Sequence, residues 1–328
     1  MENLERLGCK MKKVVSIVIP TFNEEENIQP VTEAVIDEIE KNLPEYDYEI
    51  LIIDNDSTDN TRPLIRKLCQ NNKKIKAIFN EKNFGPDNSP YFGLLQSTGD
   101  CSILFCADFQ DPVEMIHKMI REWEKGYKVI TAIKTKSKEN FIIRFFRTIY
   151  YKLIKKISST EIIEHFTGFG CYDKSFLNIL RKIDDPIPFL RGVIAEFSSN
   201  RLEIPYEQQE RRAGKGHIKF FTLYDMAMRS ITSYTKIGLR FASFLGYIVA
   251  LFSLIIGTVY FVLKLLHWYD FEFGIPVILI GMFFLGAVQL IFLGLIGEYI
   301  FTINQRLMKR PLVVVKEKIN FKEEQEGV

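Results

Sequence analysis

Two long runs of uncharged residues near the C-terminus constrain the fold of this chain more than any other feature. Residues 241–263 and 274–297 form runs of 23 and 24 residues without Asp, Glu, Lys or Arg. At a rise of about 1.5 Å per residue, a helix of either length can cross a hydrocarbon layer of about 30 Å. A buried helix of a soluble core is the alternative, but two successive runs favour a membrane hairpin. We therefore predict two transmembrane helices, at about 241–265 and 274–300.

The charges beside these runs predict how the hairpin is oriented. Five cations flank the two runs on their outer sides: Lys236, Arg240, Arg306, Lys309 and Arg310. The connecting loop, 267–272, contains no Lys or Arg. The positive-inside rule then places both termini in the cytoplasm and this loop outside. Glu298, at the inner end of the second run, is either an interfacial charge or part of a site within the membrane.

The N-terminus does not resemble a signal peptide, because residues 1–13 are polar and the apolar run at 14–19 is too short. We therefore expect the first 240 residues to stay in the cytoplasm, attached to the inner (plasma) membrane as part of a multi-pass protein. With 43 Lys and Arg against 41 Asp and Glu, the net charge of +2 gives no support to nucleic-acid binding. The five cysteines lack C-x-x-C spacing and are predicted to be free thiols.

The segment before the hairpin alternates between strand and helix patterns. Short apolar runs predict five strands, at 14–19, 49–53, 75–79, 102–106 and 129–133. Between the first two, apolar residues recur every four positions, and Asn23 followed by Glu26 has the spacing of a capping box at the start of a helix. Strands that alternate with helices indicate an α/β fold with a mostly parallel sheet.

Three polar loops follow strands of this predicted sheet, at 20–23, 54–59 and 108–111. Because parallel strands point the same way, these loops are expected to meet at the carboxyl edge, where open α/β sheets bind ligands. The chain has no phosphate-binding loop of the G-x-x-x-x-G-K-[ST] type. Carboxylates without such a loop suggest that a divalent cation neutralises a diphosphate, with Asp108 and either Gln110 or Asp111 as ligands.

Four segments taken together are similar to one known family. They are Pro20–Glu24, Asp54–Asp59, Asn83–Gly85 and Ala107–Pro112. In order and spacing they resemble the sugar-nucleotide domain of family 2 glycosyltransferases with the Rossmann-like GT-A fold. Later segments resemble the polyprenyl-phosphate glycosyltransferases of that family: Tyr172–Lys174, Arg191–Gly192, Arg211–Gly214, Gly297–Tyr299 and Arg310–Pro311. The resemblance covers nearly the whole chain.

The resemblance implies a set of site residues. The residues implied to bind the nucleotide sugar are Pro20, Asn23, Glu24, Asp54, Asn55 and Asp108. Asp108 and Gln110 are the implied ligands of Mg²⁺ or Mn²⁺. Those implied to be catalytic are Asp108, Asp111 and Arg191, and those implied to bind the acceptor phosphate or the diphosphate are Arg191, Arg211, Arg212 and Lys215.

Several positions depart from the family pattern, two of them in the nucleotide and metal motifs. The first Asp of its metal-binding Asp-x-Asp is Cys106 here, and the second Asp of its Asp-Asp-Gly-Ser is Asn55. Cys106 is either a metal ligand or a buried residue at a strand end, and the second interpretation is favoured because a soft thiol is a poor Mg²⁺ ligand.

The implied activity is the transfer of one sugar, by inverting displacement, from a nucleotide sugar to a polyprenyl phosphate on the cytoplasmic leaflet. The nearest subgroup implies UDP-glucose as donor and undecaprenyl phosphate as acceptor, and analogy suggests a homo-oligomer. A processive polysaccharide synthase is one alternative, although residues 208–212 lack the Trp of its Gln-x-x-Arg-Trp motif. A degenerate sugar-nucleotide-binding or scaffold protein in the membrane is the other.

These interpretations divide the chain into four parts. Residues 1–218 form the GT-A domain, 219–240 a juxtamembrane amphipathic helix, 241–303 the two membrane helices and 304–328 a cytoplasmic tail. Within the first part, cations alternate with aromatic and aliphatic residues near 141–157. This segment is expected either to lie on anionic lipid or to pack on the sheet, and interfacial docking is favoured.

Overall fold

The computed structural model describes residues 12–136, 163–186, 188–198, 200–213, 237–266 and 275–321. The expected interfacial segment near 141–157, residues 219–236 and the loop 267–272 lie outside the described residues. The chain divides into two compact units. The first comprises Met1–Ile149, Ile162–His217 and Lys309–Val328, and the second comprises Tyr150–Glu161 and Ile218–Met308.

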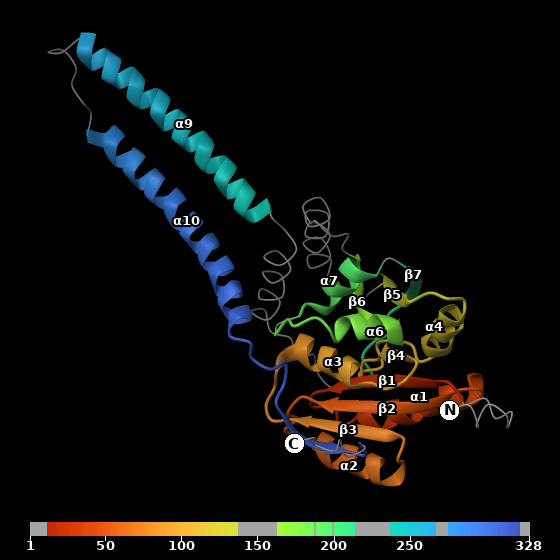
Figure 1. Cartoon of the computed structure of the whole chain (residues 1–328). Coiled ribbons are helices and arrows are strands. Elements are labelled where there is room, and N and C mark those ends of the chain that lie inside the picture. The colour runs from red at the N-terminus through yellow and green to blue at the C-terminus, as the bar shows by residue number, and fades with distance from the viewer. Residues whose placement is uncertain are drawn as a thin grey trace. The chain divides into compact units, whose positions relative to one another are not determined.

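The first unit is built on an eight-stranded sheet with the order β7-β5-β6-β4-β1-β2-β3-β8 (Figure 1). Its strands are β1 Val14–Thr21, β2 Asp47–Asp54, β3 Ile75–Asn80, β4 Cys101–Leu104, β5 Val129–Lys136, β6 Phe166–Asp173, β7 Arg201–Glu207 and β8 Val315–Ile319. β1 pairs in parallel with β2 and β4, β2 with β3, and β5 with β7. β6 is antiparallel to β4 and β5, and β8 is antiparallel to β3.

The five predicted strands correspond to β1–β5, and they all point the same way, as expected. The other three strands were not predicted. β6 contains Gly168 and Gly170, and β7 contains Pro205, so neither segment reads as a regular apolar run. The mostly parallel α/β sheet is confirmed.

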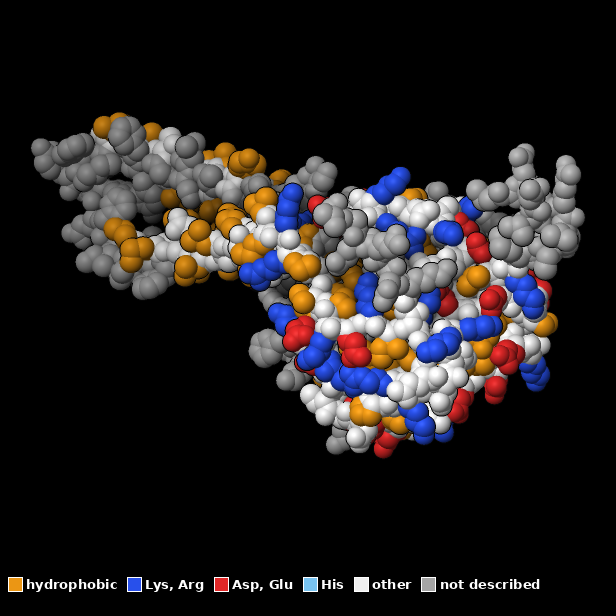
Figure 2. Space-filling model, turned by 60° about the horizontal axis from the view of Figure 1, so that its bottom comes forward, with side chains coloured by type: hydrophobic (Ala, Val, Ile, Leu, Met, Phe, Trp, Pro, Cys, Tyr) orange, Lys and Arg blue, Asp and Glu red, His pale blue; other side chains and the backbone are white. Residues whose placement is uncertain are grey.

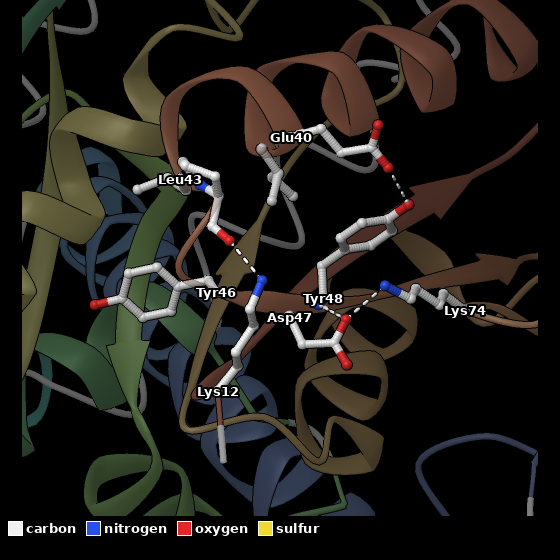
Figure 3. A pocket seen from close by; sticks show the side chains of 9 residues that line it. Lys12, Glu40, Leu43, Tyr46, Asp47, Tyr48 and Lys74 are labelled. Carbon is white, nitrogen blue, oxygen red and sulfur yellow. Dashed lines mark hydrogen bonds and ion pairs between the residues drawn. The ribbon is translucent and has the colours of Figure 1, made fainter. Parts of the chain in front are cut away.

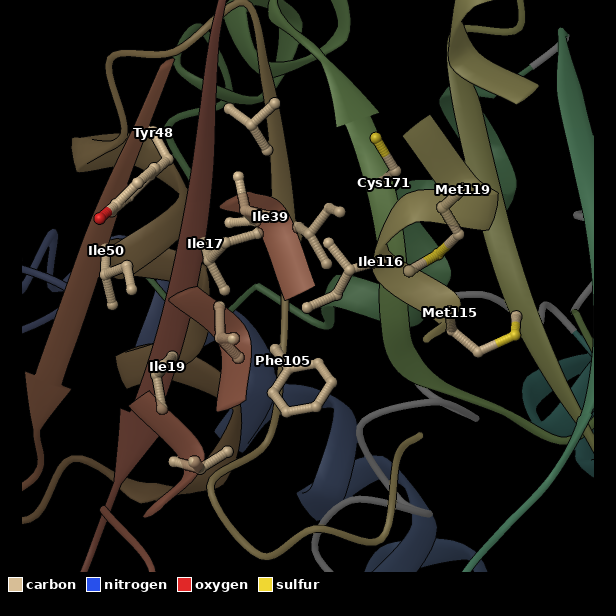
Figure 4. Close-up of a cluster of buried hydrophobic side chains, with 14 of the residues drawn as sticks. Ile17, Ile19, Ile39, Tyr48, Ile50, Phe105, Met115, Ile116, Met119 and Cys171 are labelled. Carbon is tan, nitrogen blue, oxygen red and sulfur yellow. The ribbon is translucent and has the colours of Figure 1, made fainter. Parts of the chain in front are cut away.

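Helices cover both faces of the sheet. They are α1 Ile28–Asn42, α2 Thr61–Asn71, α3 Gly85–Gln96, α4 Met115–Glu124, α6 Lys174–Leu180 and α7 Leu190–Phe197. Side chains alternate along β1, so that Ile17 and Ile19 pack with α1, α2 and α4, while Val18 packs on the opposite face with α3, α6 and α7. Figure 4 shows the first of these clusters, in which Ile39 of α1 and Ile116 of α4 meet the strands. The sheet is therefore buried on both faces, which explains its continuous apolar strands.

The predicted capping box at Asn23 was wrong. α1 begins at Ile28, and the residue before it, Asn27, makes no side-chain capping bond. Asn23 has a left-handed backbone, with φ of 54°, and its side-chain oxygen accepts a hydrogen bond from the backbone N–H of Thr58 at 2.8 Å. Its side chain therefore joins two loops at the carboxyl edge of the sheet instead of starting a helix.

Part of the expected C-terminal tail belongs to the sheet. Glu317 in β8 lies opposite Phe79 in β3 and forms an ion pair with Arg66 of α2 at 2.7 Å. Beyond the strand, the Asn320 amide donates to the carbonyl oxygens of Cys69 and Ile75 at 2.7 and 2.8 Å. Residues 315–321 thus form an edge of the first unit.

The second unit contains the two long helices, α9 Ile237–Leu266 and α10 Ile275–Leu307, which cover the two uncharged runs. Many large apolar side chains on them are exposed, and Figure 2 shows hydrophobic side chains along their surface. Within the described residues, one helical stretch is long and apolar enough to cross a membrane, Phe284–Leu307. This helix is consistent with membrane association, and the two-helix hairpin remains a prediction.

Candidate functional site

Three loops meet at the carboxyl edge of the sheet through one arginine. Arg211 follows β7, Glu24 follows β1 and Asp108 follows β4. The Arg211 guanidinium forms ion pairs with the carboxylates of Glu24 and, at 3.4 Å, of Asp108. These side chains are partly shielded from water, with exposed fractions of 19%, 10% and 17%. The predicted convergence of the loops after β1 and β4 is therefore present, and the segment after β7 joins it.

The turn at Asp108 is held by the segment after β7. The backbone N–H groups of Gln209 and Arg212 donate to the carbonyl oxygens of Gln110 and Asp108, at 3.0 and 3.3 Å. The Gln208 amide donates to the Gln110 side-chain oxygen at 3.0 Å. These contacts fix the loop that carries Asp108 even though about a hundred residues separate it from the segment after β7.

Arg212 adds a second cation at this place. Its guanidinium carbon lies 5.1 Å from the centre of the Phe109 ring, within the range of a cation–π contact. Phe109 itself has a left-handed backbone, with φ of 58°. Such strain at a non-glycine residue is a feature of ligand-binding turns and requires the surrounding contacts to hold it.

Asn27 anchors the other end of the Arg211 segment. Its side-chain amide donates to the Glu24 carboxylate at 2.7 Å and to the carbonyl oxygen of Ala213 at 3.2 Å. The Arg211 Nε donates to the same carbonyl oxygen at 2.8 Å. Asn27 was not predicted as a site residue, since its position just before α1 gave it no local signal.

Asp111 lies below the Asp108 turn, inside the protein. It is 3% exposed, and the Tyr206 hydroxyl donates to its Oδ1 at 2.6 Å. Burial raises the pKa of Asp111 to about 6, against the opposing effect of the Tyr206 hydrogen bond. The family resemblance implied a catalytic role for Asp111, but this burial favours a structural role.

Cys106 lies close to Asp111. Its thiol is half-buried, and desolvation, together with the nearby Asp111 and Asp108 carboxyl groups, raises the pKa of Cys106 well above its usual value. Cys106 is therefore a neutral thiol, which is a poor ligand for a hard cation.

The fit of the site to a divalent cation rests on Asp108 and Gln110. Both carry the oxygen ligands that Mg²⁺ and Mn²⁺ prefer. Within the described residues, no three His, Cys, Asp or Glu side chains are grouped closely enough to hold a metal by themselves. One carboxylate and one amide fit a cation that takes most of its ligands from a substrate diphosphate and from water.

A second part of the site lies at the end of β2. Asp54 is fully buried, and its Oδ2 accepts a hydrogen bond from Arg62 Nε at 2.6 Å. Arg62 also contacts Asp56 at 3.2 Å and donates to the Asn80 carbonyl oxygen at 2.8 Å. The Asp54 Oδ1 is buried without a hydrogen-bond partner among the described residues. Arg62 was not predicted, although its position in the first turn of α2 beside this acidic loop is a usable signal.

Pro20 and Asn55 lie next to these groups. Pro20 is opposite Ile53 in the β1–β2 register, one residue before the pair of Thr21 and Asp54. In the described structure the Asn55 side chain makes hydrogen bonds to residues between the end of β3 and the start of α3.

Of the two remaining cations predicted to bind phosphate, the structure describes Arg191 but not Lys215. Arg191 is the second residue of α7, with its guanidinium carbon 5.0 Å from the centre of the Phe189 ring. The adjacent Leu190 packs near Gly168 of β6, on the same side as Leu104 at the end of β4. Lys215 lies outside the described residues. A contact of Arg191 with a ligand therefore stays a prediction.

A pocket also exists at the opposite, amino edge of the sheet (Figure 3). There Lys74 pairs with Asp47 at 2.6 Å, and the Tyr48 hydroxyl donates to Glu40 at 3.0 Å. Lys12, also in this pocket, donates to the Pro44 carbonyl oxygen at 2.7 Å, so these charged side chains all bond to other residues that line the pocket. The predicted site residues lie instead at the carboxyl edge.

Known proteins resemble this chain over most of its length. Residues 16–187 match the family model described as Glycosyl transferase family 2. The bactoprenol glucosyl transferase of Shigella phage SfX is 30% identical over 305 residues, which cover 93% of this chain and 99% of that protein. The putative glycosyltransferase CsbB of Bacillus subtilis is 30% identical over 304 residues, which cover 93% and 92%. Among solved structures, a mannosyltransferase from Pyrobaculum calidifontis in complex with GDP-Man and Mn²⁺ has a TM-score of 0.45 and 15% identity, covering 68% of this chain and 63% of that chain.

Proposed function

Because this chain belongs to glycosyl transferase family 2 and has the GT-A type of α/β fold, we propose that it transfers one glucose from UDP-glucose to undecaprenyl phosphate on the cytoplasmic leaflet. The observation that carries the proposal is the meeting of Glu24, Asp108 and Arg211 at the carboxyl edge of the sheet. The names of the bactoprenol glucosyl transferases that match over nearly their full length support the lipid acceptor.

The donor is assigned to two neighbouring parts of this edge. We assign the nucleoside to the surroundings of Asp54 and Arg62, where the buried Oδ1 of Asp54 has no hydrogen-bond partner among the described residues. Pro20, Asn23 and Glu24 line the adjacent loop after β1. Asp108 and Gln110 would hold Mg²⁺ or Mn²⁺, and such a cation, when bound, offsets the charge of the leaving diphosphate.

The acceptor requires little acid–base help from the protein. A phosphate monoester oxygen is already anionic near pH 7, so it attacks the anomeric carbon without prior removal of a proton. The new bond from this oxygen to the anomeric carbon forms as the bond from that carbon to the diphosphate oxygen breaks, which inverts the configuration. The burial of Asp111 is compatible with this reaction, because no side chain must act as a strong base.

The cations after β7 are suited to bind two phosphate groups close together. Arg211 and Arg212 carry planar guanidinium groups, which bind phosphate oxygens in pairs. Arg211 is held by Glu24 and by the carbonyl oxygen of Ala213, so its direction is fixed before a ligand arrives. We assign charge stabilisation on the donor diphosphate and the acceptor phosphate to this pair, together with Arg191 and Lys215.

The membrane part of the proposal keeps the predicted topology. α9 and α10 form a hairpin with both chain termini in the cytoplasm and the loop 267–272 outside. The segment near 141–157 docks on the anionic leaflet, where it meets the lipid acceptor. A homo-oligomer is also proposed, by analogy with the family.

A direct assay tests the proposed function. Purified full-length protein is incubated with UDP-glucose, other nucleotide sugars and undecaprenyl phosphate, with and without Mn²⁺, and the lipid product is identified by mass spectrometry. We expect a single hexose on the lipid phosphate, with UDP released. Addition of many sugars to one acceptor would indicate a processive synthase, and absence of both transfer and nucleotide-sugar hydrolysis would indicate a binding or scaffold protein.

A further inference from the structure

The side chain of Asn55 uses its full hydrogen-bonding capacity inside the protein. Its amide nitrogen donates to the Asn83 side-chain oxygen at 3.0 Å and to the Gly85 carbonyl oxygen at 3.2 Å. Its oxygen accepts from the Phe84 backbone N–H at 2.9 Å and from the Asn80 amide at 3.2 Å. A side-chain amide has two donor hydrogens and two acceptor lone pairs, so these four contacts saturate it.

These contacts hold the turn between β3 and α3, residues 83–85. Gly85 has a left-handed backbone, with φ of 89°, and a Cβ added there would meet no atom within 4 Å. The turn is therefore not packed against a neighbour at this point. Besides the Asn55 contacts, one internal hydrogen bond supports it, from the Gly85 N–H to the Asn83 side-chain oxygen at 2.9 Å.

The turn belongs to the part of the edge assigned to the nucleoside. Asn80 donates to Asn55, and its carbonyl oxygen accepts from Arg62, which in turn contacts Asp54. Through Asn55, one network therefore connects the turn 83–85 with the buried carboxylate of Asp54. Displacement of the turn would move groups that lie beside the proposed nucleoside position.

We infer that Asn55 is a positioning residue that fixes the turn 83–85 beside the nucleoside and does not itself contact the ligand. This inference rests on the proposed function, and it gives a different role to a residue that the family resemblance implied to bind the nucleotide sugar. It also gives a reason for asparagine at this position. Aspartate cannot donate, so its carboxylate would face the Asn83 oxygen and the Gly85 carbonyl oxygen without a hydrogen between them.

The two ends of one hydrogen bond provide a matched pair of variants. At position 55 both the nitrogen and the oxygen are used, whereas the contacts described for the Asn83 side chain use only its oxygen. Asn55→Asp therefore removes required donors, while Asn83→Asp keeps the acceptor and makes the same change in charge. Asn71→Asp, on the exposed end of α2, controls for charge far from the turn.

The experiment measures UDP and GDP affinity of the full-length protein in detergent by calorimetry. Hydrogen exchange of the peptide 81–88 without ligand is measured in parallel. For Asn55→Asp we expect the Kd for UDP to rise roughly tenfold or more, as for a buried polar group left unpaired, and exchange to become faster. Asn83→Asp and Asn71→Asp should change the Kd by less than about threefold and leave exchange unchanged.

Two outcomes would overturn the inference. Wild-type affinity in Asn55→Asp would show that the donors are not needed, and lost affinity with unchanged exchange would show that Asn55 contacts the nucleotide directly. If Asn55→Asp does not fold, Asn83→Ala removes the hydrogen bond between Asn55 and Asn83 from its exposed end. This variant should show faster exchange of the peptide 81–88 and weaker UDP binding. Unchanged exchange would again contradict the inference. Wild-type protein that binds neither nucleotide would instead reject the proposed function.

Discussion

Cys106→Asp restores the carboxylate of the family pattern at this position, yet the structure predicts that this substitution lowers the stability of the fold. The Cys106 thiol lies close to Asp111, a carboxyl group that is 3% exposed and whose pKa burial raises to about 6. An aspartate at position 106 would place a second carboxylate against this buried one. We expect the new carboxylate to be held beside Asp111, and we therefore predict that metal binding at Asp108 does not tighten.

The cost follows from the burial of the pair. An uncompensated charge inside a protein costs about 3 to 5 kcal/mol, and the half-buried position of Cys106 favours the lower value of about 3 kcal/mol. At about 2 to 4 °C per kcal/mol for a domain of this size, the melting temperature should fall by about 6 to 12 °C. Cys106→Ser, which is nearly isosteric and neutral, should change it by no more than about 3 °C.

Two measurements check this prediction. Thermal unfolding of wild type, Cys106→Asp and Cys106→Ser gives the stability, and titration with Mn²⁺ in the presence of UDP gives the metal affinity. A Cys106→Asp variant as stable as wild type that binds Mn²⁺ more tightly would refute the reasoning, because it would show that position 106 faces the metal.

Three further predictions follow. Asp108→Asn should lower the transfer rate by roughly 10²-fold or more, as expected for loss of one electrostatic contact worth about 3 kcal/mol; a mild effect together with activity that survives complete chelation would contradict the metal-dependent mechanism. Burial alone would raise the pKa of Glu49, but hydrogen bonds from Lys76 and its other neighbours hold it below its ordinary value. The ionised Glu49 carboxylate therefore stabilises the folded protein above about pH 4.3, and this stabilisation is lost as the pH falls further. Glu49→Gln should remove that pH dependence in thermal melts between pH 3 and 7. Cysteines placed in the loop 267–272 should react with an impermeant reagent in intact cells while a cysteine at Arg310 should not, and the opposite labelling pattern would refute the predicted topology.

Local patterns of apolar residues in the sequence determined where most of the long helices and parallel strands lie. The runs at 241–263 and 274–297 became α9 and α10, and the five apolar runs became β1–β5, because apolar spacing directly reflects which side chains are removed from water. The carboxyl-edge position of Asp54 and Asp108 followed from the same pattern, since parallel strands bring their ends together. The capping box at Asn23 failed because a longer-range contact with Thr58 used the same side chain.

Only the tertiary structure decided which side chains contact one another at the site. Arg211 meets Glu24 and Asp108 across 187 and 103 positions of the chain. β8, which comes after the two long helices in the sequence, pairs with β3. No local pattern indicated that Asp111 is buried beside the Asp108 turn, or that Asn80 and the turn 83–85 together saturate the Asn55 side chain. Such contacts depend on the packing of distant segments, and a residue's own neighbours in the sequence carry no periodic signal for them.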